Sequence, residues 1–155
     1  MEKVGKVWEV TAMFMGEYNH SIDPKNRISV PAKFREELGE RFCVSIGLGG
    51  CLYLSKKEDW DAFVNNLNDL PTTRETRQLQ RQFTRNAQEC EPDKLGRIII
   101  PQGLVDAAGL KKDVVLLGTG KKIEIWDKDR LDGESTDESM EDIVEKLSTE
   151  YGLKF

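Results

Sequence analysis

The chain has 155 residues, of which 33% are charged, and a formal net charge of −5. This length allows one or two small domains with a real core, and the charged fraction and mean hydropathy of −0.54 are typical of a soluble protein. The longest apolar runs have only the length of a strand, which argues against a membrane span or a signal-peptide core and predicts a cytoplasmic protein.

The negative charge is concentrated at the C-terminal end. Residues 127–155 contain ten acidic and four basic side chains, whereas the rest of the chain contains 18 acidic and 19 basic ones. A strongly basic domain is the usual footprint of a protein that binds nucleic acid. Binding to DNA would therefore have to rely on local patches of positive charge.

The sequence shows no arrangement of residues that is typical of an enzyme or of a metal site. The three cysteines, Cys43, Cys51 and Cys90, are odd in number and lack paired metal-ligand spacing, so we predict that they are reduced and mostly buried. His20 is the only histidine, and no nucleophile elbow, Walker loop or dinucleotide fingerprint is present. We predict no catalytic activity, no cofactor and no bound metal.

Along the first half, four strands are expected, at residues 14–22, 27–30, 42–46 and 51–54. Between the second and third strands, Pro31 suits the first turn of a helix that Gly39 would end. The glycine-rich segment 47–50 joins the last two strands and does not open a helix. It therefore reads as a hairpin turn, not as a phosphate-binding loop.

Two helices are expected in the middle of the chain. Ser55 with Glu58 resembles a capping box for the first, which Pro71 would break, and Thr72 with Glu75 begins the second. The second carries an arginine stripe, formed by Arg74, Arg77, Arg81 and Arg85. This stripe could contact DNA, but a solvated face or a subunit contact is the favoured interpretation, because a groove-reading helix usually has a turn-helix partner.

The second half repeats the pattern of the first. Pro101 opens a helix that Gly109 closes, and strands at 114–117 and 123–126 flank a turn at 118–120. A last helix would begin at a capping box of Ser135 and Glu138. Its apolar stripe predicts a place in the core or a subunit contact, because the acidic outer face disfavours a membrane anchor. The stripe consists of Met140, Ile143, Val144, Leu147 and Tyr151.

One motif of nine residues occurs twice. Residues 23–31 read Asp-Pro-Lys-Asn-Arg-Ile-Ser-Val-Pro, and residues 93–101 read Asp-Lys-Leu-Gly-Arg-Ile-Ile-Ile-Pro. Asn26 and Gly96 occupy equivalent places, and both residue types tolerate the left-handed backbone of a tight turn. We interpret the motif as a hairpin loop that presents an arginine and is used twice, with the aspartate and the arginine as neighbours across the loop.

Two roles are open for this pair of charges. It could simply staple a turn. An arginine held by a carboxylate also presents a planar fork to a phosphate or to the edge of a guanine. Two copies, accompanied by Lys25 and Lys94, favour a paired anion-binding surface.

From Met13 to the last helix, the chain resembles the MraZ family of bacterial transcriptional regulators. The resemblance rests on residues 13–18, on the first motif, on Cys90-Glu91-Pro92-Asp93 and on the second motif. That family carries an Asp-x-x-x-Arg motif in each of two halves. The resemblance implies an α+β protein with an AbrB/SpoVT-like swapped-hairpin β-barrel, formed by two internal repeats and flanked by helices.

The resemblance also suggests how the chain is divided. We expect an N-terminal extension at 1–12, a first AbrB-like repeat at 13–70, a connecting helix at 71–89, a second AbrB-like repeat at 90–131 and an acidic C-terminal helix at 132–155. The internal repeat itself implies that each half supplies similar strands and that neither half folds well alone.

The function implied is that of a sequence-specific DNA-binding regulator of the bacterial division and cell-wall gene cluster, located at the nucleoid. It would bind direct repeats in a promoter region as a ring-like homo-oligomer. Six residues would form the DNA site: Arg27 and Arg97 as principal contacts, Lys25 and Lys94 on phosphates, and Asp23 and Asp93 orienting the arginines. The rival is an oligomeric scaffold whose repeated loops are assembly contacts.

Overall fold

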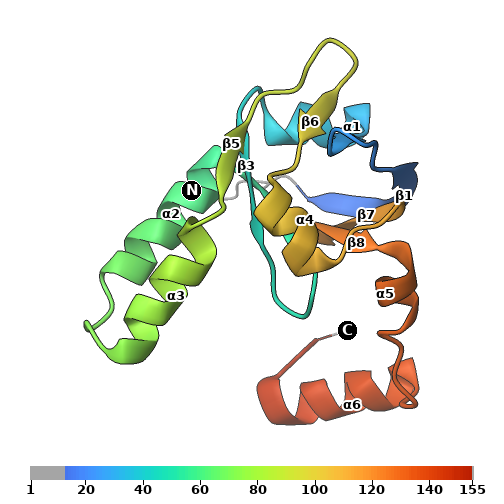
Figure 1. The fold of residues 1–155 in the computed structure, drawn as a ribbon. Coiled ribbons are helices and arrows are strands. Elements are labelled where there is room, and N and C mark those ends of the chain that lie inside the picture. The colour runs from blue at the N-terminus through green and yellow to red at the C-terminus, as the bar shows by residue number, and fades with distance from the viewer. Residues whose placement is uncertain (1–12, 155) are drawn as a thin grey trace.

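The computed structural model describes residues 13–154, so the expected extension at 1–12 lies outside the described residues. Helices and strands both contribute, which confirms the α+β class (Figure 1). The strands are β1 (Phe14–Ser21), β2 (Arg27–Ser29), β3 (Phe42–Ile46), β4 (Leu52–Lys56), β5 (Gln88–Cys90), β6 (Arg97–Ile99), β7 (Asp113–Gly120) and β8 (Ile123–Asp127). The helices are α1 (Ala32–Leu38), α2 (Lys57–Asn68), α3 (Arg74–Thr84), α4 (Gln102–Ala108), α5 (Lys128–Asp132) and α6 (Met140–Tyr151).

The strands form two antiparallel sheets. Six of them follow the order β1-β7-β8-β4-β3-β5, and β2 pairs with β6 in a separate two-stranded sheet, here called the ribbon. In the described part of the chain the larger sheet is open, with β1 and β5 at its edges. The expected closed barrel is therefore not observed. The reason is that β2 leaves β1 after the first loop and pairs with β6, so the two sheet edges do not meet.

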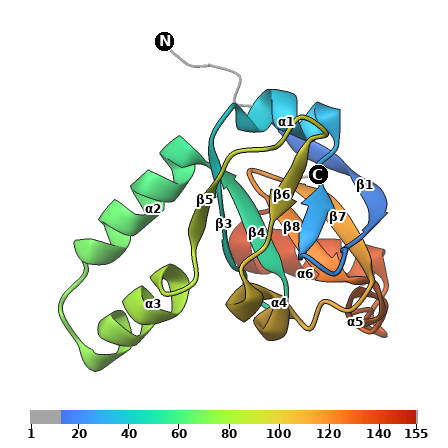
Figure 2. The same ribbon diagram turned by 45° about the horizontal axis from the view of Figure 1, so that its top comes forward.

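The two halves of the chain exchange strands. β1 pairs with β7, β5 pairs with β3, and β2 pairs with β6, so each half completes the sheet of the other. β4 and β8 join the halves at the centre of the large sheet. The ribbon lies across one face of that sheet, between α1 and α4 (Figure 2). The exchange brings the two copies of the repeated motif into one ribbon.

The main core lies between the ribbon and the large sheet. Alternation along β2 and β6 turns Ile28 and Ile98 inward, and both are buried. Phe34 of α1 and Leu104 of α4 close the same core from the two ends. Both helices begin directly after their predicted prolines and end at their predicted glycines. The repeated motif thus places one buried isoleucine and one helix start in each half.

One expected turn is part of a strand. β7 continues to Gly120 and β8 begins at Ile123, and the N–H of Thr119 donates to the carbonyl of Lys122 over 2.9 Å, so the turn lies at residues 119–122, partly beyond the predicted 118–120. Gly118 is needed for a different reason, since a Cβ atom there would collide with the backbone of Met15 on β1. The glycine marks a close approach of two strands.

The expected helix caps are also corrected. Ser55 belongs to β4, and α2 has no side-chain cap. Thr73, not Thr72, caps α3, and Ser139, not Ser135, caps α6, each accepting a backbone N–H three residues later. A cap must stand directly before the first helical turn, so the hydroxyl nearest that turn makes the bond.

Two helical parts stand away from the main core. α2 and α3 form a helical hairpin, here called the arm, at one side of the sheet, where the rings of Phe63 and Phe83 lie 4.9 Å apart (Figure 1). None of the residues of α6 is buried, so its apolar stripe is not part of the core. Within residues 13–154, no helix is long and apolar enough to cross a membrane.

The three cysteines are free and buried, as predicted. Burial raises the pKa of Cys51 and of Cys90 to about 12. These thiols therefore stay protonated at neutral pH. No group of three or more His, Cys, Asp and Glu side chains that could hold a metal ion occurs in the part of the chain that the structure describes.

Candidate functional site

The two loops that precede β2 and β6 have the same backbone. In the first loop, the N–H of Asn26 donates to the carbonyl of Asp23 over 2.9 Å, and the N–H of Asp23 donates to the carbonyl of Arg27 over 3.1 Å. The second loop makes both bonds at 2.9 Å. The left-handed residue is Asn26 in one (φ 62°) and Gly96 in the other (φ 79°), as predicted. This is a tight turn followed by a left-handed residue, as in three-residue hairpin loops.

In each loop one aspartate fixes the arginine. The Oδ1 atom of Asp23 accepts the backbone N–H groups of Lys25 and Arg27, both at 2.9 Å, and its Oδ2 atom accepts the Nε of Arg27 at 2.6 Å. Asp93 makes the same three bonds in the second loop, each of 2.9 Å. Each aspartate therefore bonds both to the backbone of its turn and to the side chain of its arginine.

These bonds lower the pKa of both carboxyl groups. The largest cause is the backbone N–H of Arg27 at Asp23 and that of Arg97 at Asp93, and the arginine side chains add to it, while burial opposes it. Because the folded pKa lies below the ordinary value of 3.8, the stability gained is present above that pH and is lost as the pH falls from there through the lower folded value. Both ion pairs are therefore intact at neutral pH.

A substitution can separate the two contributions. Arg27→Ala removes the side-chain donor but keeps the backbone N–H, so the pKa of Asp23 should rise only part of the way to its ordinary value of 3.8. A ¹³C NMR titration of the carboxyl groups measures this, with Asp93 of the same variant as the internal control. A pKa of Asp23 that returns fully to 3.8 would show that the side chain, not the turn, sets it.

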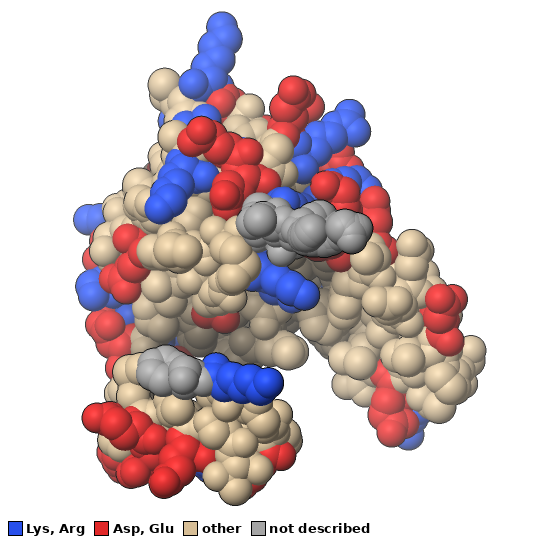
Figure 3. All heavy atoms as spheres, turned by 180° about the vertical axis from the view of Figure 1, so that it is seen from behind, with Lys and Arg blue, Asp and Glu red and all other residues tan. Residues whose placement is uncertain are grey.

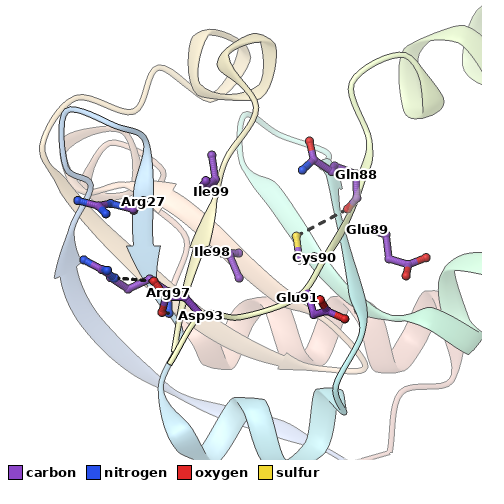
Figure 4. Close-up of a pocket in the computed structure, with 9 residues that line it drawn as sticks. All are labelled: Arg27, Gln88, Glu89, Cys90, Glu91, Asp93, Arg97, Ile98 and Ile99. Atoms are coloured by element: carbon purple, nitrogen blue, oxygen red, sulfur yellow. Dashed lines mark hydrogen bonds and ion pairs between the residues drawn. The ribbon is translucent and has the colours of Figure 1, made fainter. Parts of the chain in front are cut away.

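The ribbon presents one face to the outside, here called the outer ribbon face. Arg27 is paired with Ile99, and Ser29 with Arg97, while Ile28 and Ile98 are paired on the inner side. Directly paired residues point to the same side of a sheet, so the outer ribbon face carries Arg27, Ser29, Arg97 and Ile99. The two arginines are diagonal neighbours, a relation that places them about 7–8 Å apart. Figure 4 shows both side chains pointing the same way.

Each arginine keeps most of its donors for a ligand. The side chains of Arg27 and Arg97 are 31% and 30% exposed, and each uses its Nε for an aspartate. Of the five guanidinium protons, the four on the terminal nitrogens have no protein acceptor among residues 13–154. The carboxylates also offset the repulsion between two like charges. The outer ribbon face thus carries two guanidinium groups of fixed orientation, whose terminal nitrogens point outward.

Each loop is braced by the helix of the other half. Asn26 donates from Nδ2 to the Oε1 of Gln102, the first residue of α4, over 3.0 Å. At the other end, the guanidinium of Arg35 from α1 lies over Gly96, where a Cβ atom would collide with it, and its Nε donates to the carbonyl of Val30. The positions of the arginines thus depend on both halves.

The structure places the two predicted lysines at different points of their loops. Lys25 is the third residue of its turn, where the other loop has Leu95, and Lys94 is the second, where the first loop has Pro24. Both lysines are exposed. Because β2 and β6 run antiparallel, the two loops lie at opposite ends of the ribbon. The positive charges therefore flank the outer ribbon face at both ends but are not symmetric.

Beside the arginines lies a hollow of about 280 Å³ with an acidic wall (Figure 4). Glu89 and Glu91 form that wall. The Nε atom of Arg41 lies 3.2 Å from the Oε2 atom of Glu89 and 3.9 Å from that of Glu91. Carboxylates repel phosphate, so an anion would approach from the side away from β5. The arginine stripe is exposed, with three of its members on α3 and Arg85 directly after it, and the arm that carries α3 lies away from the outer ribbon face (Figure 2).

Ser29 and Ile99 are the residues of this face that the sequence interpretation missed. Strand alternation was the available signal, because it puts Ser29 beside Arg27 and Ile99 beside Arg97. What the sequence did not provide was the pairing of β2 with β6. That pairing turns two separate loops into one four-residue face.

Comparison with known proteins agrees with the doubled motif. The model of the family described as "MraZ protein, putative antitoxin-like" matches the chain twice, at residues 13–82 and 83–147. The chain belongs to the MraZ family. The MraZ family is one of transcriptional regulators and not of enzymes.

Three relatives show how far the similarity extends, and each is named "Transcriptional regulator MraZ". The protein of Lachnoclostridium phytofermentans is 53% identical over 143 residues, which is 92% of this chain and 100% of the relative. That of Heliobacterium modesticaldum is 48% identical, covering 87% of this chain and 96% of its own. That of Clostridium tetani is 45% identical, covering 91% and 100%.

Proposed function

We propose that this protein is a sequence-specific DNA-binding transcriptional regulator and that the outer ribbon face enters the major groove. The observation that carries the proposal is the pair of arginines, held at Nε by aspartates 2.6 and 2.9 Å away and free at their terminal nitrogens among residues 13–154. The two terminal nitrogens of each arginine suit bidentate hydrogen bonds to O6 and N7 of a guanine. A two-stranded ribbon also has the size that the major groove admits.

The loops at the ends of the ribbon would position the protein on the duplex. Lys25 and Lys94 are exposed on these loops and can reach phosphates at the edges of the groove. Phosphate contacts supply affinity and fix the register, whereas the arginines supply the sequence preference. Asp23 and Asp93 would keep the arginines from turning towards the phosphates.

The family suggests the place of action. The relatives are named as transcriptional regulators, and the MraZ resemblance implies a promoter of the division and cell-wall gene cluster, in the cytoplasm at the nucleoid. Sequencing the DNA retained by the purified protein tests the function and does not require that the operator be known beforehand. Enrichment of one short sequence in repeated copies is expected. Recovery of unrelated fragments, or of no DNA, would contradict the proposal.

We infer further that several copies assemble head to tail into a ring, and that α6 makes the contact. Met140 and Tyr151 on its apolar stripe are 73% and 78% exposed. In the view from behind, a notch separates α6 from the arm, and the outer surface of α6 is crowded with acidic side chains (Figure 3). A stripe of this kind favours a partner surface that is apolar at its centre and basic at its rim.

A groove between the arm and the large sheet has those properties. Its volume is about 420 Å³, and its lining includes Tyr53, Trp60, Phe63, Phe83, Lys121 and Lys122. Lys122 lies 5.4 Å from the ring centre of Tyr53. The α6 of one copy would place its apolar stripe in the groove of the next, with its carboxylates near the two lysines. Such a contact uses two different patches and therefore closes rings or continues as a filament.

A lysine in the apolar stripe should break the assembly. Leu147→Lys would bury a charge in the proposed contact, whereas Thr149→Lys puts the same charge on the opposite, exposed side of α6. Light scattering after gel filtration is expected to give about the mass of one chain, 17.7 kDa, for the first variant and the oligomer for the second. A wild-type protein that is monomeric at micromolar concentration would contradict the assembly.

The positions of these two surfaces also distinguish a DNA-binding regulator from the rival interpretation, an oligomeric scaffold. α6 lies behind the large sheet in Figure 2, whereas the ribbon lies in front of it. The proposed assembly contact and the proposed DNA contact therefore use different sides of the molecule. A scaffold held together by the repeated loops would need the ribbon for assembly.

A further inference from the structure

We propose that Ile99 reads the 5-methyl group of a thymine and that its difference from Ser29 gives each DNA site a direction. This inference rests on the proposed function, in which the outer ribbon face enters the major groove. It assigns a specificity-determining role to a residue outside the Asp-x-x-x-Arg motif. It also explains how a nearly symmetric ribbon could prefer direct repeats.

The position of Ile99 carries the first step. Its side chain is 59% exposed, although the neighbours Ile98 and Ile100 are buried. It is paired with Arg27 and shares the outer ribbon face with both arginines. In Figure 4 its side chain points away from that of Ile98. An exposed, branched apolar side chain therefore lies beside two cations in the proposed reading surface.

The symmetry of the ribbon carries the second step. The centre of the ribbon is the pair Ile28 and Ile98, and a twofold rotation about it exchanges Arg27 with Arg97 and Ser29 with Ile99. Two equivalent arginines would read both sides of a site alike. A site read by them alone would thus have no preferred orientation. On the outer ribbon face, the serine and the isoleucine are the residues that break this symmetry.

The chemistry of the bases carries the third step. In the major groove, thymine alone among the four standard bases presents a methyl group, and apolar side chains recognise it by contact. A serine hydroxyl can instead bond to several base edges. Directly paired residues have Cβ atoms about 4.5–5.5 Å apart, and base pairs are about 3.4 Å apart. The thymine should therefore lie one or two base pairs from the guanine that Arg27 reads.

The test removes only the methyl group. In DNA containing the enriched repeats, each thymine position in turn is replaced by deoxyuridine, and affinity is measured by fluorescence anisotropy at fixed salt. Wild-type protein should lose about fourfold per repeat at one position, the value of one buried methyl group. Ile99→Ser should bind thymine and uracil DNA equally. The exchange variant Ser29→Ile/Ile99→Ser should move the sensitive thymine to the other side of the site.

The controls keep the outcomes distinct. Ser29→Ala should keep the wild-type response to uracil, and light scattering should show that Ile99→Ser assembles normally. Equal losses for wild type and Ile99→Ser, no loss for either, or dissociation of the Ile99→Ser oligomer would each overturn this inference while leaving DNA binding in place. Failure of the wild-type protein to bind any DNA would overturn the proposed function and this inference together.

Discussion

Arg27→Ala and Arg97→Ala are each expected to weaken DNA binding by roughly 5- to 150-fold, because one bidentate arginine–guanine pair contributes about 1–3 kcal/mol. The double variant should lose more than either. Both side chains lie on the outer ribbon face and contribute nothing to the core, so the fold should persist. Fluorescence anisotropy gives the affinities, and thermal unfolding checks that the variants stay folded.

Two matched controls sharpen this experiment. Arg27→Lys keeps the charge but loses the fork, so it should bind almost as poorly as Arg27→Ala if a guanine is read, and nearly normally if only a phosphate is contacted. Arg81→Ala removes an exposed arginine from α3 and should have little effect. Wild-type affinity in the double variant would remove the site assignment. Loss of the oligomer on reversing the charge with Arg27→Glu would favour the scaffold.

The second large effect concerns the number of DNA repeats. One chain offers two arginines on its ribbon and two lysines on the adjoining loops, and non-specific contacts of this kind hold DNA at roughly 10⁻⁴ to 10⁻⁶ M. In a ring, neighbouring copies would present the same ribbon in the same orientation, and several repeats would be bound together. Deleting all repeats but one should therefore lower the affinity by roughly 10²- to 10⁴-fold.

DNA with the same length and composition provides the control for that deletion. The removed repeats are replaced by scrambled sequence, and a third probe carries alternate repeats inverted. Binding to the original probe should be the tightest and should weaken as salt is raised. Equal affinity for one repeat and for several would contradict binding by a ring. Equal affinity for direct and inverted repeats would contradict the common orientation.

Much of the candidate site could be predicted because its geometry is local. Asn26 and Gly96 adopt the left-handed backbone conformation, and each aspartate bonds to the arginine four residues later. Both features depend on residues within one turn. The buried place of Ile28 follows from alternation along a short strand. These features are fixed by neighbouring residues, so a sequence pattern suffices to predict them.

The pairing of distant strands could not be predicted in the same way. β1 and β7 are about a hundred residues apart in the chain, and other apolar strands of the sequence could have paired with either of them. β2 pairs with β6 and not with β1, so the expected barrel is not closed. The same pairing places the two arginines on one face of the ribbon. The predicted cap residues of α3 and α6 were wrong because several hydroxyl residues stand near each helix start. Tertiary contacts decide at which of them the helix begins.

Methylation interference on the enriched DNA tests the central claim most directly, namely that the two arginines of one ribbon read bases from the major groove. Dimethyl sulfate methylates guanine at N7, the atom that a bidentate arginine requires. The proposal predicts that fragments methylated at specific guanines in every repeat are excluded from the complex, and that Arg27→Ala/Arg97→Ala protein no longer discriminates against them. Binding that ignores guanine N7 and is blocked only by methylation of adenine N3 in the minor groove would contradict it.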